Sequence, residues 1–425
     1  MHHRLWTQVE ASRDRILGLC QDLVRINTVN PYSGDASPGG ERPGQEYLAP
    51  LLSDLGAEVE LFDCPPDIYQ RTGILGPRNR DFSGRPNLVA TFDFGGDGPT
   101  VVINGHMDTV GIDNMGADAL EAREQDGWLW GRGTTDCKGG LTVGVSAIRA
   151  LLELQTPLHG RIIFQSVVDE ECNGGGAGTL SCFNAGYTGD VAVFVDGNDD
   201  HLTLGCGGCL TADVFVEGQE GHAALGTGVS AIEKALVTKQ GIDAFKRARE
   251  TERPECRVNL GILNSGKHPA VVPGSAYLSL NIVYDVAEAE ASRATTGLYG
   301  GKPIRDEFER ALANAEATDE WLRAHPSRVE WVKDLIPYTQ SADDPWLQRF
   351  VAAYCETTGG PPVYDRMVAW SDAAHPVALF GVPTILYGPG LEGTAHSSDE
   401  RVEIDALVRC TKVIATFLLR ELGQC

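Results

Sequence analysis

Short apolar segments alternate with helical segments along the first 200 residues, and this alternation restricts the fold more than any other feature of the chain. The apolar segments are "NLVATFD" (87–93), "TVVINGHMD" (100–108), "RIIFQSVVDEE" (161–171) and "DVAVFVDG" (190–197). The stretch from Gly139 to Leu154, which lies between the second and third of these apolar segments, has helical periodicity. Strands that are separated by helices indicate a mainly parallel sheet covered on both faces. We therefore predict an α/β domain here.

The pattern changes after Asp200. Residues 210–218 and 277–283 alternate with period two, and the segment as a whole predicts strand, helix, two strands, helix, strand. From residue 345 the first pattern returns. We therefore predict one catalytic domain in two parts, residues 1–208 and 337–425, with a compact α+β domain inserted at residues 209–336.

Charge and hydropathy exclude several classes of partner. The 425 residues include 35 basic and 59 acidic side chains, a net charge of −24, which disfavours nucleic acid and anionic lipid surfaces. No apolar run approaches the roughly 20 residues of a membrane helix, and the N-terminal segment lacks the apolar core of a signal peptide. The odd count of 11 cysteines favours free thiols. We expect a cytoplasmic protein that acts on a small molecule.

Side chains that bind metal ions follow the predicted strands or lie in glycine-rich loops. In open parallel sheets, functional groups gather at the carboxyl ends of the strands. At a buried strand end, carboxylates without a nearby cation are costly unless a bound cation balances them. The candidates are His106, Asp108, Asp136, Glu170, Glu171, Asp196 and His396.

Each of these features has a structural explanation when it stands alone, since His-x-Asp pairs are common and adjacent glutamates usually face solvent. Taken together, one aspartate that can bridge, with a histidine and a carboxylate on each side, predicts two metal ions as in two-metal hydrolases. Glu170, beside a ligand, is then a candidate general base for a metal-bridging water. Asp108 follows His106 by two positions, so it can reach the other ring nitrogen.

The order of the motifs resembles the co-catalytic di-zinc metallopeptidase and deacylase family, which includes acetylornithine deacetylase, succinyl-diaminopimelate desuccinylase, aminoacylase and glutamate carboxypeptidase. The motifs are His-x-Asp, Gly-Arg-Gly-x-x-Asp-x-Lys-Gly, Glu-Glu, a single carboxylate and Ala-His-x-x-Asp-Glu, spread over nearly the whole chain. The resemblance implies a zinc-peptidase catalytic domain with an inserted ferredoxin-like dimerisation and lid domain. It also implies a hydrolase that acts on C–N amide bonds.

The resemblance further implies a role for each motif residue. One zinc ion would be bound by His106 and Asp196, the other by Glu171 and His396, and Asp136 would bridge both, with Co²⁺ or Mn²⁺ as possible substitutes. Glu170 would be the catalytic base, Asp108 the partner of His106, and the Asp136–Cys137 peptide bond cis. In a homodimer, His222 of "GQEGHAALGTG" would reach the partner's active site and stabilise the oxyanion; the alternative is an ordinary loop histidine.

Two departures from the family pattern leave the substrate open. Where members that act on free amino-acid carboxylates have a clamping arginine, this chain reads "NIV" (281–283), and Val283 cannot bind a carboxylate. The turn before that strand reads "AVVP" (270–273), where those family members have Asn-Val-Val-Pro. Possible replacements for the clamp are Arg366, Arg257, Lys267 and His268, and candidate substrate contacts are Arg366, Asp372 and Gly388.

We predict a zinc-dependent metallopeptidase or N-acyl amino acid deacylase. Because of Val283, an amidohydrolase acting on a substrate without a free α-carboxylate is the first alternative. The second is a non-catalytic metal-binding relative. A thiol oxidoreductase built on Cys206 and Cys209 is a more distant third, since a redox motif would need a helix N-terminus beside it.

Overall fold

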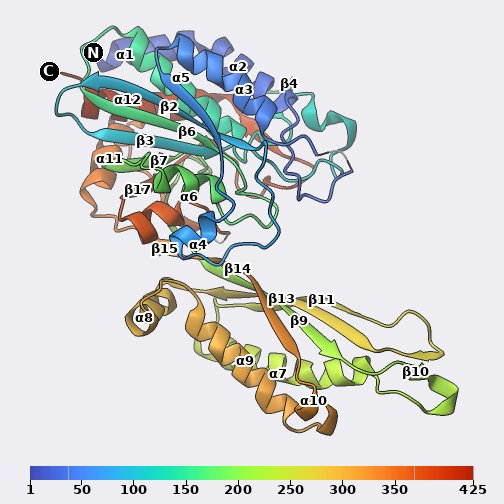
Figure 1. The fold of residues 1–425 in the computed structure, drawn as a ribbon. Coiled ribbons are helices and arrows are strands. Elements are labelled where there is room, and N and C mark those ends of the chain that lie inside the picture. Colours follow the sequence, from blue (N-terminus) through green and yellow to red (C-terminus); the bar gives the residue numbers. More distant parts are fainter. Residues whose placement is uncertain (37, 368, 425) are drawn as a thin grey trace. The chain divides into compact units, whose positions relative to one another are not determined.

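The computed structural model describes residues 1–36, 38–367 and 369–424, apart from the side chain of Ala117. The chain divides into two units (Figure 1), the larger comprising residues 1–72, 79–206 and 339–425, and the smaller residues 73–78 and 207–338. The sequence analysis placed residues 73–78 in the catalytic domain. They belong to the smaller unit because the Leu75 carbonyl accepts the N–H of Asp334 at 2.7 Å, a contact without any sequence signal.

A nine-stranded mixed sheet forms the centre of the larger unit. Its strands lie in the order β1-β2-β6-β3-β7-β17-β8-β15, with β16 beside β8. The four central strands β6, β3, β7 and β17 are parallel, whereas β1, β2 and β8 pair antiparallel. The bounds are β1 (Glu58–Asp63), β2 (Pro86–Gly95), β3 (Thr100–His106), β6 (Gly160–Val167), β7 (Val191–Phe194), β8 (Leu202–Cys206), β15 (Tyr338–Thr339), β16 (Tyr364–Met367) and β17 (Thr384–Leu386).

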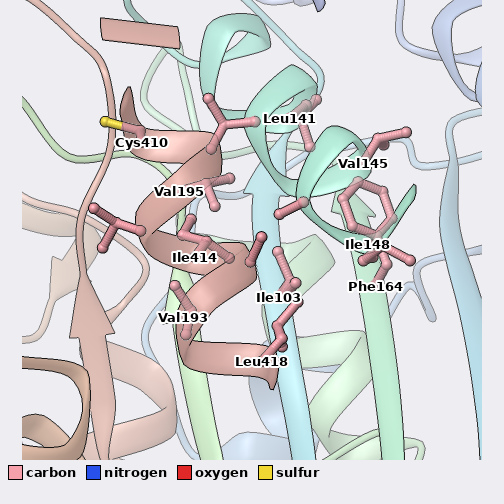
Figure 2. Packing of buried hydrophobic residues seen from close by; sticks show 14 of the residues in the cluster. Ile103, Leu141, Val145, Ile148, Phe164, Val193, Val195, Cys410, Ile414 and Leu418 are labelled. Carbon is pink, nitrogen blue, oxygen red and sulfur yellow. The ribbon is translucent and has the colours of Figure 1, made fainter. Parts of the chain in front are cut away.

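Helices cover both faces of this sheet, as predicted for an α/β domain. On one face, α5 (Lys138–Glu153) and α12 (Ile404–Leu422) pack against alternate residues of the central strands, and Figure 2 shows Ile103 of β3 between them. The next residue, Asn104, points to the opposite face, where its amide donates to Thr179 of α6 (Ala177–Asn184) at 3.2 Å. Further helices are α1 (His2–Ala11), α2 (Arg13–Arg25), α3 (Arg42–Asp54), α4 (Ile68–Thr72) and α11 (Pro345–Thr358).

The parallel register brings three chain segments to one edge of the sheet. Ile103 of β3 lies opposite Phe164 of β6 and Val193 of β7, so the three strands run side by side in the same direction. Residues 106–108, 168–171 and 195–197 lie at or directly after their carboxyl ends. Metal-type side chains that are far apart in sequence are therefore neighbours at this edge.

The smaller unit is a ferredoxin-like α+β domain, as the resemblance implies. Its four-stranded antiparallel sheet has the order β11-β13-β9-β14, and its main helices are α7 and α9. Along β9, alternate residues from Leu210 to Val216 are buried in the core of this unit. The bounds are β9 (Gly208–Glu217), α7 (Ala231–Glu252), β11 (Val258–Ser265), β13 (Ser275–Tyr284), α8 (Val286–Thr296), α9 (Lys302–Glu316), α10 (Glu320–Ala324) and β14 (Arg328–Leu335).

Short elements complete the structure. A three-stranded sheet consists of β4 (Arg123–Gln125), β5 (Trp128–Trp130) and β18 (Arg401–Glu403), and a two-stranded one of β10 (Gly221–His222) and β12 (Val271–Val272). The ten cysteines within the described residues are free thiols, as expected. Across the same residues, no helix has the length and apolar character needed to cross a bilayer.

Candidate metal and catalytic centre

The structure brings the five predicted metal ligands together. Nε2 of His106 lies 2.9 Å from Oδ1 of Asp136 and 3.7 Å from Oδ1 of Asp196. Nε2 of His396 lies 3.1 Å from Oδ2 of Asp136 and 3.0 Å from Oε1 of Glu171. The two oxygens of Asp136 therefore face different histidines, which is the geometry that a bridging carboxylate needs.

Asp136 is placed by the turn between β5 and α5. The Asp136–Cys137 peptide bond is cis, as the resemblance implies. The Cys137 thiol is buried beside His106 and accepts the His106 backbone N–H at 3.2 Å. Burial raises the pKa of the Cys137 thiol to about 12. The two carboxylate oxygens of Asp136 lie beside both histidines, as a bridging ligand requires.

The donor set fits two divalent cations. One group contains His106, Cys137 and Asp196, the other contains Asp136, Glu171 and His396, and the ligand atoms within each group are close enough to share an ion. In the described part of the chain, no lysine or arginine forms an ion pair with Asp136, Glu171 or Asp196. Carboxylate oxygens with imidazole nitrogens, and no lysine or arginine beside them among the described residues, are the ligands expected for zinc and similar metals.

The electrostatics show how strained these carboxylates are without a cation. Burial, together with the charge of Asp136, raises the pKa of Glu171 to about 7 and that of Asp196 to about 6. Hydrogen bonds that the imidazole donates to the carboxylates of Asp136 and Glu171 raise the pKa of His396 to about 11. His396, Asp136 and Glu171 are therefore electrostatically coupled.

Asp108 orients the centre in a different way from the one predicted. Its backbone carbonyl, not its carboxylate, is the hydrogen-bond partner of His106, at 2.8 Å from Nδ1, while the carboxylate Oδ1 is 3.7 Å from the same nitrogen. The carboxylate instead accepts the backbone N–H groups of Glu170 and Glu171, at 3.4 and 3.1 Å. Asn30 donates to it at 2.7 Å. Asp108 therefore connects the end of β3 to the turn after β6.

Glu170 is half-buried in that turn, and its pKa is raised well above the ordinary glutamate value by burial. The preceding residue, Asp169, adopts a left-handed backbone with φ of 64°. Its carboxylate is held by Arg85 at 3.2 Å, and Arg85 also donates to Glu41 at 2.9 Å. These buried partners fix the turn that carries Glu170 and Glu171. Sequence reasoning missed them, since they come from distant loops.

The three predicted substrate contacts have different surroundings. Asp372 is buried, and burial raises its pKa to about 7 although the Thr179 hydroxyl donates to it at 2.6 Å. Gly388 packs so closely that an added Cβ would lie 2.5 Å from the Val195 carbonyl oxygen, beside Asp196. Arg366 is exposed and donates to the Thr339 hydroxyl at 3.3 Å. Gly388 thus has a packing role at the Asp196 strand end.

His222 lies in the smaller unit, at the end of β10. Its side chain is exposed, and Nδ1 accepts the backbone N–H of Ala224 at 3.2 Å. This contact leaves Nε2 as the nitrogen available to another molecule. The role of His222 in a partner's active site stays a prediction.

Comparison with known proteins places the chain in a family. The profile of peptidase family M20/M25/M40 matches residues 102–420, three quarters of the chain. N-formyl-4-amino-5-aminomethyl-2-methylpyrimidine deformylase from Halalkalibacterium halodurans is 28% identical, with 97% of this chain and 96% of that protein covered. Acetylornithine deacetylase from Myxococcus xanthus is 28% identical, with 87% and 94% covered.

A solved structure has the same fold. A dinuclear metal-binding peptidase of family M20 from Bacillus subtilis superposes with a TM-score of 0.62 over 97% of this chain and 98% of its own, at 14% identity. The extent of the profile match, together with the convergence of the family's ligand motifs at one sheet edge, identifies the chain as a member of peptidase family M20/M25/M40, whose members are metal-dependent amide-bond hydrolases.

Proposed function

We propose that this protein is a zinc-dependent hydrolase that cleaves the amide bond of a small substrate without a free α-carboxylate. The observation that carries the hydrolase assignment is the arrangement around Asp136, whose two oxygens contact the two ligand histidines. Glu170 lies next in sequence to the ligand Glu171 and so places a base beside the proposed metal centre. The dinuclear metal content of the Bacillus subtilis family member supports two ions here.

The residues divide the chemistry between them. His106, Asp136, Glu171, Asp196 and His396 would hold the two zinc ions, which would polarise the substrate carbonyl and lower the pKa of a water molecule. Glu170 accepts a proton from the attacking water and later donates it to the leaving nitrogen. Burial raises its pKa, which favours a group that accepts a proton and later returns it.

The substrate class follows from Val283. The resemblance to the family puts this residue where other members have a clamping arginine, and its side chain lies on the β13 face opposite the buried positions Ile282 and Tyr284. An aliphatic side chain offers no hydrogen bond to a carboxylate. The deformylase from Halalkalibacterium halodurans matches this chain over nearly its whole length. The substrate in its name is an N-formyl compound, and that name contains no carboxylate. A formamide or a similar simple amide is therefore the proposed substrate.

A peptidase or N-acyl amino acid deacylase is the second candidate, and the acetylornithine deacetylase relative favours it. It would need a cationic side chain to replace the clamp. Arg366 has the exposure for such a role, although its guanidinium donates to Thr339 in this structure.

Substrate profiling separates these candidates. The zinc-loaded protein would be assayed with N-formyl-4-amino-5-aminomethyl-2-methylpyrimidine, N-acetyl amino acids and dipeptides, and kcat/KM compared. We expect the formamide to be preferred. Preference for the N-acetyl amino acids would support the deacylase, while two bound zinc ions without hydrolysis of any compound would support a non-catalytic relative.

A homodimer through the smaller unit is also part of the proposal. The edge strand β11 exposes Ile262 and Leu263, and the adjoining start of α7 exposes Ile232 and Leu236. An unpaired strand edge beside exposed apolar side chains is typical of a protein interface. In such a dimer, His222 would serve the partner's active site. A cytoplasmic location stays a prediction from the sequence.

A further inference from the structure

A buried ion pair lies behind the turn that carries Asp136. Arg132 and Glu400 are 1% and 0% exposed, and Nη1 of Arg132 donates to Oε2 of Glu400 at 2.6 Å. The other oxygen, Oε1, accepts the backbone N–H groups of Gly133, Thr135 and Asp136 at 2.9, 3.1 and 3.3 Å. One carboxylate therefore fixes the backbone of the residue that faces both ligand histidines.

The same arginine extends the network to a second ligand. Nη2 of Arg132 donates to Oδ1 of Asn114 at 2.8 Å, and Nε donates to the Gly111 carbonyl at 3.0 Å. The Asn114 amide in turn donates to the backbone carbonyl of His396 at 3.0 Å. His396 has φ of 63°, a left-handed conformation that side-chain-bearing residues rarely adopt without support. The contact from Asn114 supplies such support.

Asp136 and His396 are thus the two ends of one hydrogen-bonded chain. They belong to the same candidate metal group, with Glu171, and their side chains are 3.1 Å apart. A planar guanidinium can donate to three acceptors at fixed angles, so Arg132 sets the position of Asn114 and Glu400 relative to each other. The network therefore determines the relative placement of two ligands from distant parts of the sequence.

We propose that Arg132, Glu400 and Asn114 are positioning residues that set the affinity of the metal ion bound by His396, Glu171 and Asp136. The inference rests on the proposed metal centre and adds to it three residues that touch neither ion. Groups that orient metal ligands from behind typically change metal affinity 10- to 100-fold when they are removed.

Asn114 offers the sharpest test because it is exposed, so its replacement leaves the buried ion pair intact. Metal-free Asn114→Ala would be titrated with zinc against a competing chelator, beside wild type and the control Asn184→Ala, an exposed asparagine at the end of α6. We expect one of the two zinc dissociation constants to rise about tenfold or more in Asn114→Ala, and the other to change by less than about threefold. The control should match wild type.

The kinetic readout distinguishes positioning from catalysis. At saturating zinc, Asn114→Ala should recover kcat to within about twofold of wild type, whereas loss of a catalytic group would persist. A general folding defect would weaken both zinc sites and lower the melting temperature, unlike the selective loss expected here.

Arg132→Lys provides an independent variant. Lysine keeps the charge beside Glu400 but lacks the planar guanidinium, whose nitrogens point to separate acceptors. The hydrogen bond to Asn114 should therefore be lost while the ion pair survives. The zinc dissociation constant that rises in Asn114→Ala should rise in this variant too, and the other should stay unchanged. Equal zinc dissociation constants in wild type, Asn114→Ala and Arg132→Lys would overturn this inference alone. A wild-type protein that binds no zinc would overturn both the proposed metal function and this inference.

Discussion

The Nε2 atom of His375 lies 2.9 Å from the carbonyl oxygen of Gly175, beneath the glycine-rich turn that follows Glu170 and Glu171. Among the described residues, Nδ1 of this histidine has no hydrogen-bond partner. The imidazole is therefore held neutral in a buried position, with Nε2 donating its hydrogen. Burial lowers the pKa of His375 to about 4.

This lowered pKa predicts an acid-sensitive contribution to stability. An unfolded histidine takes up a proton near pH 6.5, whereas folded His375 resists protonation until about pH 4, so stability is present above pH 6.5 and is lost as the pH falls. Between pH 7 and 5, the free energy of unfolding of wild type should fall by about 2 kcal/mol more than that of His375→Gln. Urea denaturation at both pH values measures this difference, and parallel curves for the two proteins would contradict it.

Replacement of Glu170 by glutamine should greatly slow turnover and leave the proposed metal centre in place. The amide keeps the shape of the side chain but cannot accept the proton of the attacking water, so kcat should fall roughly 10²- to 10⁴-fold. Zinc content, measured by elemental analysis, should equal that of wild type. Glu171→Gln serves as the matched control, since it should lose zinc as well as activity. A fully active Glu170→Gln would show that another group is the base.

Removal of metal should inactivate and destabilise the protein together. Without cations, Asp136, Glu171 and Asp196 face one another in a buried site, and their mutual repulsion opposes folding. Dialysis against a chelator should therefore lower the melting temperature and eliminate hydrolysis, and two equivalents of zinc should restore both. Activity that survives complete removal of metal would argue against the proposed function.

Val283→Arg should shift the substrate preference toward carboxylates. A charge-assisted hydrogen bond contributes about 1.5–3 kcal/mol, so kcat/KM for N-acetyl amino acids should rise roughly tenfold or more. Hydrolysis of the formamide should fall, because this substrate has no carboxylate to pair with the new arginine. Val283→Leu controls for the change in side-chain volume. No gain on any carboxylate-bearing substrate would show that the position does not contact the substrate.

Leu236→Glu in α7 should dissociate the proposed dimer. The Leu236 side chain is 47% exposed in the single chain, and a glutamate there would carry a charge into the apolar interface. Light scattering after size exclusion would measure the mass. Leu298→Glu is the control, since Leu298 is 54% exposed and lies between α8 and α9, outside the two elements of the proposed interface. A wild-type monomer at micromolar concentration would contradict the dimer.

The sequence predicted the residues that follow strand ends and missed those that support them. His106, Glu171 and Asp196 could be found because each follows an apolar run, and parallel strands bring such positions together. His396 was found through its motif and not through any strand. The class of each domain could be predicted from periodicity. Short apolar runs separated by helices indicate the α/β domain, whereas strands with period-two alternation indicate the inserted α+β domain.

Asn30, Asn114 and Arg85 could not be predicted as parts of the metal centre. Each lies in a loop, and its contact is decided by how that loop crosses the folded domain rather than by a local pattern. The same reason explains why the Asp108 carboxylate was assigned to His106: two residues on an extended strand share a side, yet the strand ends at His106 and the carboxylate turns toward the Glu170–Glu171 backbone.

The two histidines predicted to bind metal differ sharply in their access to solvent. The side chain of His106 is 1% exposed, at the end of a central strand, while that of His396 is 53% exposed, on a loop near the C-terminus. Ligand exchange requires water or a chelator to approach the metal–nitrogen bond. We therefore expect the two ions to leave in sequence, the one at His396 within a shorter lifetime, so that brief chelation yields a protein with a single ion retained at His106.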